Sequence, residues 1–278
     1  MSIPINTAVL CIGLTLSLAG ATASAADTEA AEPHDGATWH GCIGLPTHDQ
    51  LEDALDYARA QSNGGFNLDM WATVVNRDGV VCQVAFTGAN RGSQWPGSRV
   101  ISAQKANTAN AFSLPGLALS TANLYAAVQP GGTLYGLQHS NPVDTEVAYQ
   151  GPASNFGQAN DPMTNHRIGG VNVFGGGLGL YNSKGVLVGG IGVSGDTSCA
   201  DHNIAWRTRH QLNLDFVPAG VGHKSAATPN GDDNINYKGL VVDPSLANDF
   251  SHPICKIAGV DGVSGISATL PAVQKVKP

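Results

Sequence analysis

Residues 66–86 read FNLDMWATVVNRDGVVCQVAF, and this stretch decides the expected fold. Hydrophobic side chains alternate with mostly polar ones over 66–74 and again over 80–86, a period of two that is typical of half-buried β-strands. The turn sequence NRDG separates the two runs. We therefore expect an antiparallel β-hairpin over these residues.

A second hairpin is expected further along the chain. Residues 171–182 and 186–194 form two extended runs joined by the turn sequence SKG. Glycines at positions 175, 176, 177 and 179 thin the first run, which indicates the close approach of a ligand or of another backbone segment. The two hairpins supply four strands, and we expect a fifth strand in the poorly patterned remainder.

Helices are expected before, between and after the hairpins. The sequence THDQ at 47–50 is a capping box, and its helix is expected to end near Ser62 because two glycines follow. Three more helices are expected, over 98–112, 120–128 and 198–212, the last with Ser198 as its cap and Asp201 completing a capping-box variant. This order indicates an α+β domain in which helices flank an antiparallel sheet.

The chain divides into a leader, a domain and an extension. Residues 1–25 carry no charged side chain and hold a short apolar stretch before an A-x-A-like site, so they are predicted to be a signal peptide. Residues 26–38 are predicted to be a flexible leader, 39–212 the domain and 213–278 an irregular C-terminal extension. Within the domain, 131–170 is a forty-residue loop, a length typical of functional or interface loops.

Composition excludes several classes of protein and partner. Of 278 residues, 42% are hydrophobic and 13% are charged, which excludes a disordered or collagen-like protein. The chain has 14 Lys and Arg against 21 Asp and Glu, and its net charge of −7 disfavours binding to nucleic acid. No later segment has 18 uninterrupted apolar residues, so no membrane span is expected. The signal peptide predicts a periplasmic or secreted protein.

Cysteine usage agrees with export. Cys11 lies in the signal peptide, which leaves Cys42, Cys82, Cys199 and Cys255. An even number in an oxidising compartment predicts two disulfides, and the sequence leaves their pairing open among three connectivities. A zinc site is disfavoured because successive members of this set lie at least 40 residues apart, without a C-x-x-C pair.

The run GIGVSG, residues 190–195, matches the G-x-G-x-x-G pattern of dinucleotide-binding loops. That pattern requires a parallel βαβ unit, whereas this run lies in a strand of the second predicted hairpin. We therefore interpret its glycines as a requirement of the backbone rather than as a nucleotide site.

Histidines in the long loop and in the last helix are candidate metal ligands and acid–base groups. His139 and His166 lie in the loop near carboxylates such as Asp161, and polar loop residues are favoured site candidates. His202 follows Asp201 in the predicted helix, where an ordinary exposed histidine is the alternative. The candidate metal ligands are His139, His166 and His202, and the candidate catalytic groups are His139, Arg167, Asp201 and His202.

Cations gather where a glycine-rich loop meets the helix that is expected to begin at Ser98. Arg91, Arg99 and Lys105 flank this junction. A helix N-terminus with nearby cations can hold a carboxylate, such as a haem propionate, and the alternative is an ordinary solvated face. The motif C-x-x-C-H does not occur in the sequence, which excludes covalent c-type haem.

Four segments occur in a characteristic order. They are the hairpin around Asp78-Gly79, the stretch AQKANTA at 103–109, the entry Gly169-Gly170-Val171, and the run GGIGVSG at 189–195 followed by Asp201. In this order they resemble the HbpS/GlcG haem-degrading-domain family, over roughly residues 45–212. The resemblance implies a profilin-like fold of three α/β/α layers with a five-stranded antiparallel sheet, and assembly into homo-oligomers. It also implies haem or iron binding, as in some members.

Three hypotheses follow from the residues and the resemblance. The first is an exported oligomer that binds haem or a related small ligand, with Arg91, Lys105, His166 and His202 as cofactor-binding residues. The second is an enzyme that acts on a small organic substrate by acid–base chemistry in the same cleft. The third is an accessory structural oligomer without a site. The enlarged loop and the C-terminal extension depart from the family pattern, so the ligand can differ.

Overall fold

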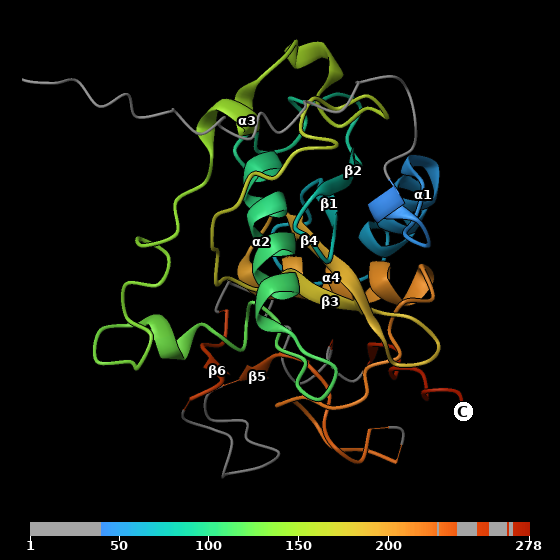
Figure 1. The fold of residues 1–278 in the computed structure, drawn as a ribbon, viewed down its shortest axis with the longest axis vertical. Helices are drawn as coiled ribbons and strands as arrows, with labels where there is room; N and C mark the ends of the chain where they lie inside the picture. The colour runs from blue at the N-terminus through green and yellow to red at the C-terminus, as the bar shows by residue number, and fades with distance from the viewer. Residues whose placement is uncertain (1–39, 227, 238–248, 256–265, 267–268) are drawn as a thin grey trace, which may run out of the picture. The chain divides into compact units, whose positions relative to one another are not determined.

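The structure is a computed structural model that describes residues 40–226, 228–237, 249–255, 266 and 269–278 (Figure 1). The signal peptide predicted at 1–25 and the flexible leader predicted at 26–38 lie outside these residues. Within them, no helix is long and apolar enough to cross a membrane.

Both predicted hairpins are present in one antiparallel sheet. The first consists of β1 (Trp71–Asn76) and β2 (Val81–Phe86), and the second of β3 (Gly177–Tyr181) and β4 (Leu187–Ser194). The strand order is β2-β1-β4-β3, so the two hairpins join along β1 and β4. The first strand of each hairpin begins later than the sequence pattern predicts, at residue 71 for β1 and at residue 177 for β3.

The prediction of a five-stranded sheet is wrong for the described residues, in which this sheet has four strands. The segment that follows the last helix meets the outer edge of β3 at a single bridge between Tyr181 and Asp215. Tyr181 donates its N–H to the Leu214 carbonyl at 2.8 Å and accepts from the Phe216 N–H at 3.4 Å. The C-terminal extension also forms a separate parallel pair, β5 (Asn236–Tyr237) and β6 (Ser251–His252).

Three of the four predicted helices form. They are α1 (His48–Arg59), α2 (Ser98–Phe112) and α4 (Ser198–Gln211), and a short α3 (Thr145–Tyr149) lies in the long loop. The capping box of α1 is confirmed, because the Thr47 side chain accepts from the Gln50 N–H while the Gln50 side chain accepts from the Thr47 N–H. The N-cap of α4 is Thr197 rather than Ser198.

The helix expected over 120–128 is wrong, since only a 3-10 turn at Ala126–Val128 forms there. Local and tertiary bonds take the backbone groups that a helix would use. The Asn123 Oδ1 accepts from both the N–H and the hydroxyl of Ser120. The N–H of Thr121 donates to the Gly177 carbonyl, and its hydroxyl oxygen accepts from the Gly177 N–H.

Alternate residues of β1 belong to two separate core clusters. Ala72 and Val74 pack in one cluster with side chains of α1 and α4. Trp71 and Val75 pack in another with side chains of α2. All six residues of β1 are therefore buried, which the sequence did not indicate because each face also carries a polar residue, Thr73 on one and Asn76 on the other.

Glycines of β4 allow α2 to lie directly on the sheet. A Cβ added at Gly192 would overlap the Ser102 carbonyl oxygen and lie 2.5 Å from the Ala106 nitrogen, both in the backbone of α2. The small buried side chains of α2, including Ala103 and Ala106, complete the close approach. Because β4 pairs only with antiparallel neighbours, these glycines serve helix packing rather than a parallel βαβ nucleotide site.

Two disulfides are present, as predicted, and the structure gives their pairing. Cys42 bonds to Cys82, which joins the segment before α1 to β2. Cys199 bonds to Cys255, which joins the first turn of α4 to the C-terminal extension.

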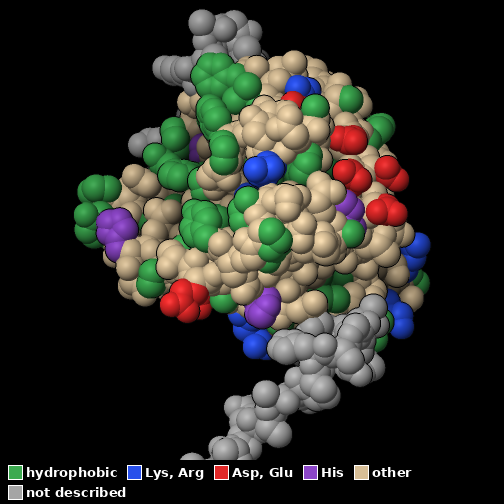
Figure 2. All heavy atoms as spheres, turned by 90° about the horizontal axis from the view of Figure 1, so that it is seen from above, with side chains coloured by type: hydrophobic (Ala, Val, Ile, Leu, Met, Phe, Trp, Pro, Cys, Tyr) green, Lys and Arg blue, Asp and Glu red, His purple; other side chains and the backbone are tan. Residues whose placement is uncertain are grey.

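Large hydrophobic side chains are exposed on the surface. Trp95, Tyr135 and Tyr149 are 52%, 65% and 60% exposed. Figure 2 shows hydrophobic side chains gathered along one side of the face that it views. Such gatherings commonly mark ligand or protein contacts.

Candidate functional site

A pocket of about 530 Å³ lies at the N-terminal end of α2. Its walls come from the sheet, the helix and the long loop. The aromatic side chains that line it are Trp71 of β1, Tyr149 at the end of α3, and Phe156. Val100 of α2 adds an aliphatic surface, and Arg91 of the glycine-rich loop lines the same pocket.

A buried ion pair fixes the loop wall of this pocket to α2. The Arg99 Nε donates to the Asp161 Oδ2 at 2.8 Å, and its Nη2 donates to the other carboxylate oxygen. The remaining terminal nitrogen donates to the Ala148 carbonyl at 2.7 Å. The guanidinium lies over the Phe156 ring, 3.7 Å from its centroid. Arg99 thus holds three parts of the loop in place.

The carboxylate of Asp161 also organises its own loop. It accepts from the Gly157 N–H at 2.6 Å and from the Met163 N–H at 2.8 Å. Gly157 has a φ of +78°, and a Cβ there would overlap the Phe86 ring at the end of β2. Asp161 therefore neutralises Arg99 and shapes the wall.

Arg91 is the cation of this pocket that remains available to a ligand. The side chain is exposed, and no described residue pairs with its guanidinium. The Arg99 side chain, by contrast, is 3% exposed, and its charge is neutralised by Asp161. Arg91 thus leaves a positive charge beside an aromatic pocket, an arrangement suited to a flat apolar ligand with a carboxylate at its edge.

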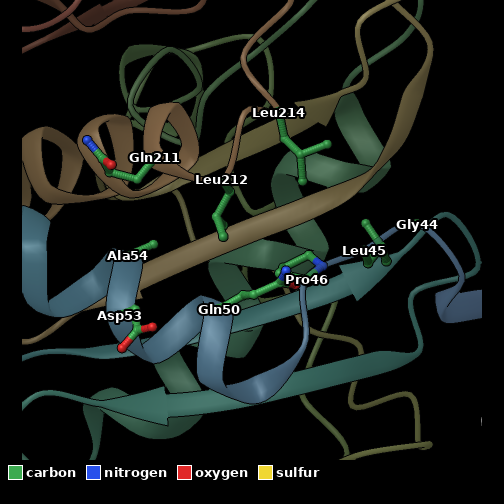
Figure 3. A pocket seen from close by; sticks show the side chains of 9 residues that line it. All are labelled: Gly44, Leu45, Pro46, Gln50, Asp53, Ala54, Gln211, Leu212 and Leu214. Carbon is green, nitrogen blue, oxygen red and sulfur yellow. The ribbon is translucent and has the colours of Figure 1, made fainter.

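A second cavity, of about 440 Å³, lies between the start of α1 and the end of α4 (Figure 3). Gln50 and Asp53 of α1 line it, and Gln211, Leu212 and Leu214 line it at the end of α4 and just after it. Its charged lining group is the Asp53 carboxylate, and no cation lines it. This cavity therefore disfavours an anionic ligand.

The structure brings Lys105 and Asp201 together in the interior. The Lys105 Nζ donates to the Asp201 carboxylate at 2.7 Å, to the Val193 carbonyl at 3.0 Å and to the Ser194 hydroxyl at 3.3 Å. These acceptors match the three donors of an ammonium group. Burial raises the pKa of Asp201 to about 6 and lowers the pKa of Lys105. Lys105 is 1% exposed, so in this structure it presents no charge to a ligand in solution.

His202 is fully buried beside this pair on α4. Its Nε2 accepts from the Ile235 N–H at 3.2 Å and lies 3.1 Å from the Asn234 Oδ1. Its Nδ1 has no hydrogen-bond partner among the described residues. Burial lowers the pKa of His202 to about 4. Because Asp201 is also only 2% exposed, a substrate in solution reaches neither of these candidate catalytic groups in this structure.

The loop candidates lie at the surface. His139 and Arg167 are exposed, and His166 is half-buried. Arg167 donates from Nε to the Asp78 carbonyl at 2.8 Å, so it ties the loop to the first hairpin turn. No contact within the described part of the chain joins these three side chains to one another or to His202, and none of them lines either cavity.

Sequence reasoning placed Arg91 at the right junction but missed the aromatic wall. Trp71 looked like an ordinary strand residue, and Phe156 had no periodic context in the loop. One usable signal was Tyr149, a large aromatic side chain in a loop of functional length.

Comparisons with known proteins agree with the resemblance seen in the sequence. A family model described as "Haem degrading protein HbpS-like" matches residues 47–209. No curated protein matches the chain.

Three solved structures are similar to it. A complex of PduOC with heme is 25% identical, with a TM-score of 0.43, over 62% of this chain and 97% of that one. The Klebsiella pneumoniae protein ORFY, of family model DUF336, is 23% identical, with a TM-score of 0.40, over 59% of this chain and 86% of that one. HbpS is 17% identical, with a TM-score of 0.35, over 59% of this chain and 84% of that one.

Proposed function

Because the chain belongs to the HbpS-like family, we propose that it binds haem, or a similar flat ligand with a carboxylate edge, in the pocket at the start of α2. The observation that carries the proposal is the combination in one pocket of an aromatic wall and a guanidinium without a described partner. Trp71 and Phe156 offer aromatic surface to a ring system, and Arg91 offers a partner for a carboxylate such as a propionate.

The lining residues fit this ligand. A volume of about 530 Å³ lies within the range of small-molecule sites. Tyr149 is the lining side chain whose oxygen can ligate haem iron. Haem, when bound, supplies the redox and oxygen chemistry of its iron. The residues of this chain stack against the ring, hold its carboxylate and exclude water from one face.

The proposal extends to the setting of the protein. We place it outside the cytoplasm, periplasmic or secreted, as a homo-oligomer on a profilin-like three-layer frame. The two disulfides support an oxidising compartment, and the exposed Trp95, Tyr135 and Tyr149 support a contact between subunits. The roles of His139, His166, Lys105 and His202 as ligands of haem or metal stay predictions.

An absorbance titration of the oxidised protein with hemin tests the site. We expect a saturable Soret shift. In Arg91→Gln the affinity should fall roughly fivefold, because an exposed charge pair contributes about 1 kcal/mol. In Tyr149→Phe the Soret band should move, since the phenol oxygen is lost.

Arg167→Gln is the matched control, because it removes an exposed arginine that lies outside the pocket. The absence of a Soret shift in the unaltered protein would refute haem binding, and equal losses in the Arg91 and Arg167 variants would refute this location. His139→Ala, His166→Ala and His202→Ala in the same titration test the histidines, and a band lost in only one of them would identify the iron ligand.

A further inference from the structure

A cluster of metal-type ligands lies where the C-terminal extension meets α4. The sulfurs of Cys199 and Cys255 and a ring nitrogen of His252 all lie within 4.8 Å of one another. Cys199 stands in the first turn of α4, and the other two residues form the spacing H-x-x-C. In this structure the two sulfurs form a disulfide.

The hydrogen bonds of His252 fix its tautomer. Its Nδ1 lies 2.6 Å from the Pro253 carbonyl oxygen, which can only accept, so Nδ1 carries the proton and Nε2 carries the free lone pair. A ligating histidine is commonly held in this way by a carbonyl behind it. The Tyr125 ring packs against the imidazole with centroids 4.8 Å apart. His252 is 2% exposed, so its Nε2 is directed within the protein.

Ser198 completes the surroundings of that lone pair. Its hydroxyl donates to the His252 Nε2 at 2.7 Å and accepts from the Gly175 N–H at 2.7 Å. A metal at Nε2 would replace the hydroxyl proton as the partner of the lone pair. The serine oxygen would then lie beside an open coordination position.

The backbone around the sulfurs favours thiolates. The N–H of Cys199 points to the Cys255 Sγ at 3.3 Å. Both sulfurs lie at the N-terminal end of the fourteen-residue helix α4, whose dipole stabilises negative charge. Two thiolates and a neutral imidazole are ligands that Zn²⁺ prefers.

We propose that reduction of the Cys199–Cys255 disulfide converts this cluster into a binding site for Zn²⁺ or a metal of similar preference. A dithiol reductant supplies two electrons and two protons, the S–S bond breaks, and the reductant becomes a disulfide. The metal then displaces the two thiol protons and binds the two Sγ atoms and the His252 Nε2, with the fourth position open beside Ser198. The disulfide and the metal are alternative links between α4 and the extension.

The second disulfide provides an internal comparison. Cys42 and Cys82 have no third ligand of this kind within reach among the residues that the structure describes. Their reduction should therefore yield two ordinary thiols.

The test uses the full chain, reduced with a phosphine that is then removed without oxygen. Zn²⁺ is titrated against a chromophoric chelator, and Co²⁺ is added separately as a spectroscopic probe. We expect one metal per chain, with sulfur-to-cobalt charge-transfer bands. Alkylation followed by mass spectrometry should find Cys199 and Cys255 protected by Zn²⁺ while Cys42 and Cys82 react. The oxidised protein should bind no metal at this site.

His252→Asn removes the nitrogen ligand while its amide can still accept from Ser198. We expect the Zn²⁺ affinity of the reduced protein to fall at least about tenfold. His223→Asn, at an exposed histidine outside the cluster, should leave it unchanged. The proposal would be overturned if the reduced protein bound no Zn²⁺ or if His252→Asn left the Zn²⁺ affinity unchanged. It would also be overturned if Zn²⁺ protected all four cysteines equally. Equal protection would also reveal metal binding by an unfolded chain. None of these results depends on hemin binding.

Discussion

Replacement of Asp161 by Asn should break the ion pair that holds the loop wall of the proposed haem pocket against α2. The change keeps the size of the side chain but removes its charge and half of its accepting capacity. In the structure the carboxylate accepts from Arg99 through two nitrogens and from the N–H groups of Gly157 and Met163. An amide leaves the Arg99 guanidinium buried without its counter-charge and turns an NH₂ group toward some of these donors.

The magnitude follows from burial. The side chains of Arg99 and Asp161 are 3% and 0% exposed, so solvent cannot replace the lost interactions. Removing one partner of a buried ion pair typically costs about 3–5 kcal/mol. Against a typical total of roughly 5–15 kcal/mol, this is a large share of the free energy of unfolding. Hemin affinity should fall as well, because the same loop carries Tyr149 and Phe156 into the pocket.

Urea denaturation of the oxidised protein, followed by tryptophan fluorescence, measures the effect. The midpoint should fall by roughly 1–2 M at the usual slope for a chain of this size. Asp144→Asn is the control, because Asp144 caps α3 in the same loop, is exposed, and is replaced by an equally good capping residue. A loss below about 1 kcal/mol in Asp161→Asn would refute the view that this ion pair holds the loop.

Three further predictions concern the frame around the site. Gly192→Ala should cost about 1–3 kcal/mol of unfolding free energy, since its Cβ would overlap the backbone of α2. Gly116→Ala is the control and should cost no such free energy, because a Cβ there meets nothing within 4 Å. Equal urea midpoints for the two variants would contradict this prediction. The pKa of His202 lies below its ordinary value in the folded protein, so the unfolded chain binds the proton first and stability is lost as pH falls from 6.5 through 4. Between pH 7 and pH 5 the free energy of unfolding should therefore fall by about 2 kcal/mol more in the unaltered protein than in His202→Gln. Parallel curves of stability against pH would disprove the lowered pKa of His202. The double variant Cys42→Ser and Cys82→Ser removes a disulfide that joins residues 40 positions apart, which should cost about 4 kcal/mol of unfolding free energy through the entropy of the unfolded chain. The loss is measured from the urea midpoint under oxidising conditions. A loss near zero would show that the disulfide does not constrain the unfolded chain.

Local patterns predicted most of the fold. Alternation and a turn sequence predicted both hairpins, and the helix expected over 98–112 is α2 with the same bounds. The errors arise where distant partners decide the structure. At 120–128 the bonds of Thr121 to Gly177 replace the helix, and those residues are 56 positions apart.

The site was predicted less well for the same reason. Arg91, Arg99 and Lys105 look alike in the sequence, as cations near the start of one helix. Only the fold shows that Arg99 meets a carboxylate 62 positions away and Lys105 one 96 positions away, which leaves Arg91 for a ligand. In the same way, cysteine spacing alone disfavoured zinc, whereas His252 and Cys255 reach Cys199 only after folding.

The outer edge of β3 bears on how copies of this protein can associate. Three segments cover it in turn: Thr121 exchanges bonds with Gly177, Arg209 donates to the Gly179 carbonyl at 3.0 Å, and the 214–216 segment pairs with Tyr181. Exposed strand edges recruit strands from other molecules and so promote aggregation. Here a foreign strand would have to displace three separate anchors. Assembly of subunits through a continuous sheet is thereby blocked on this side.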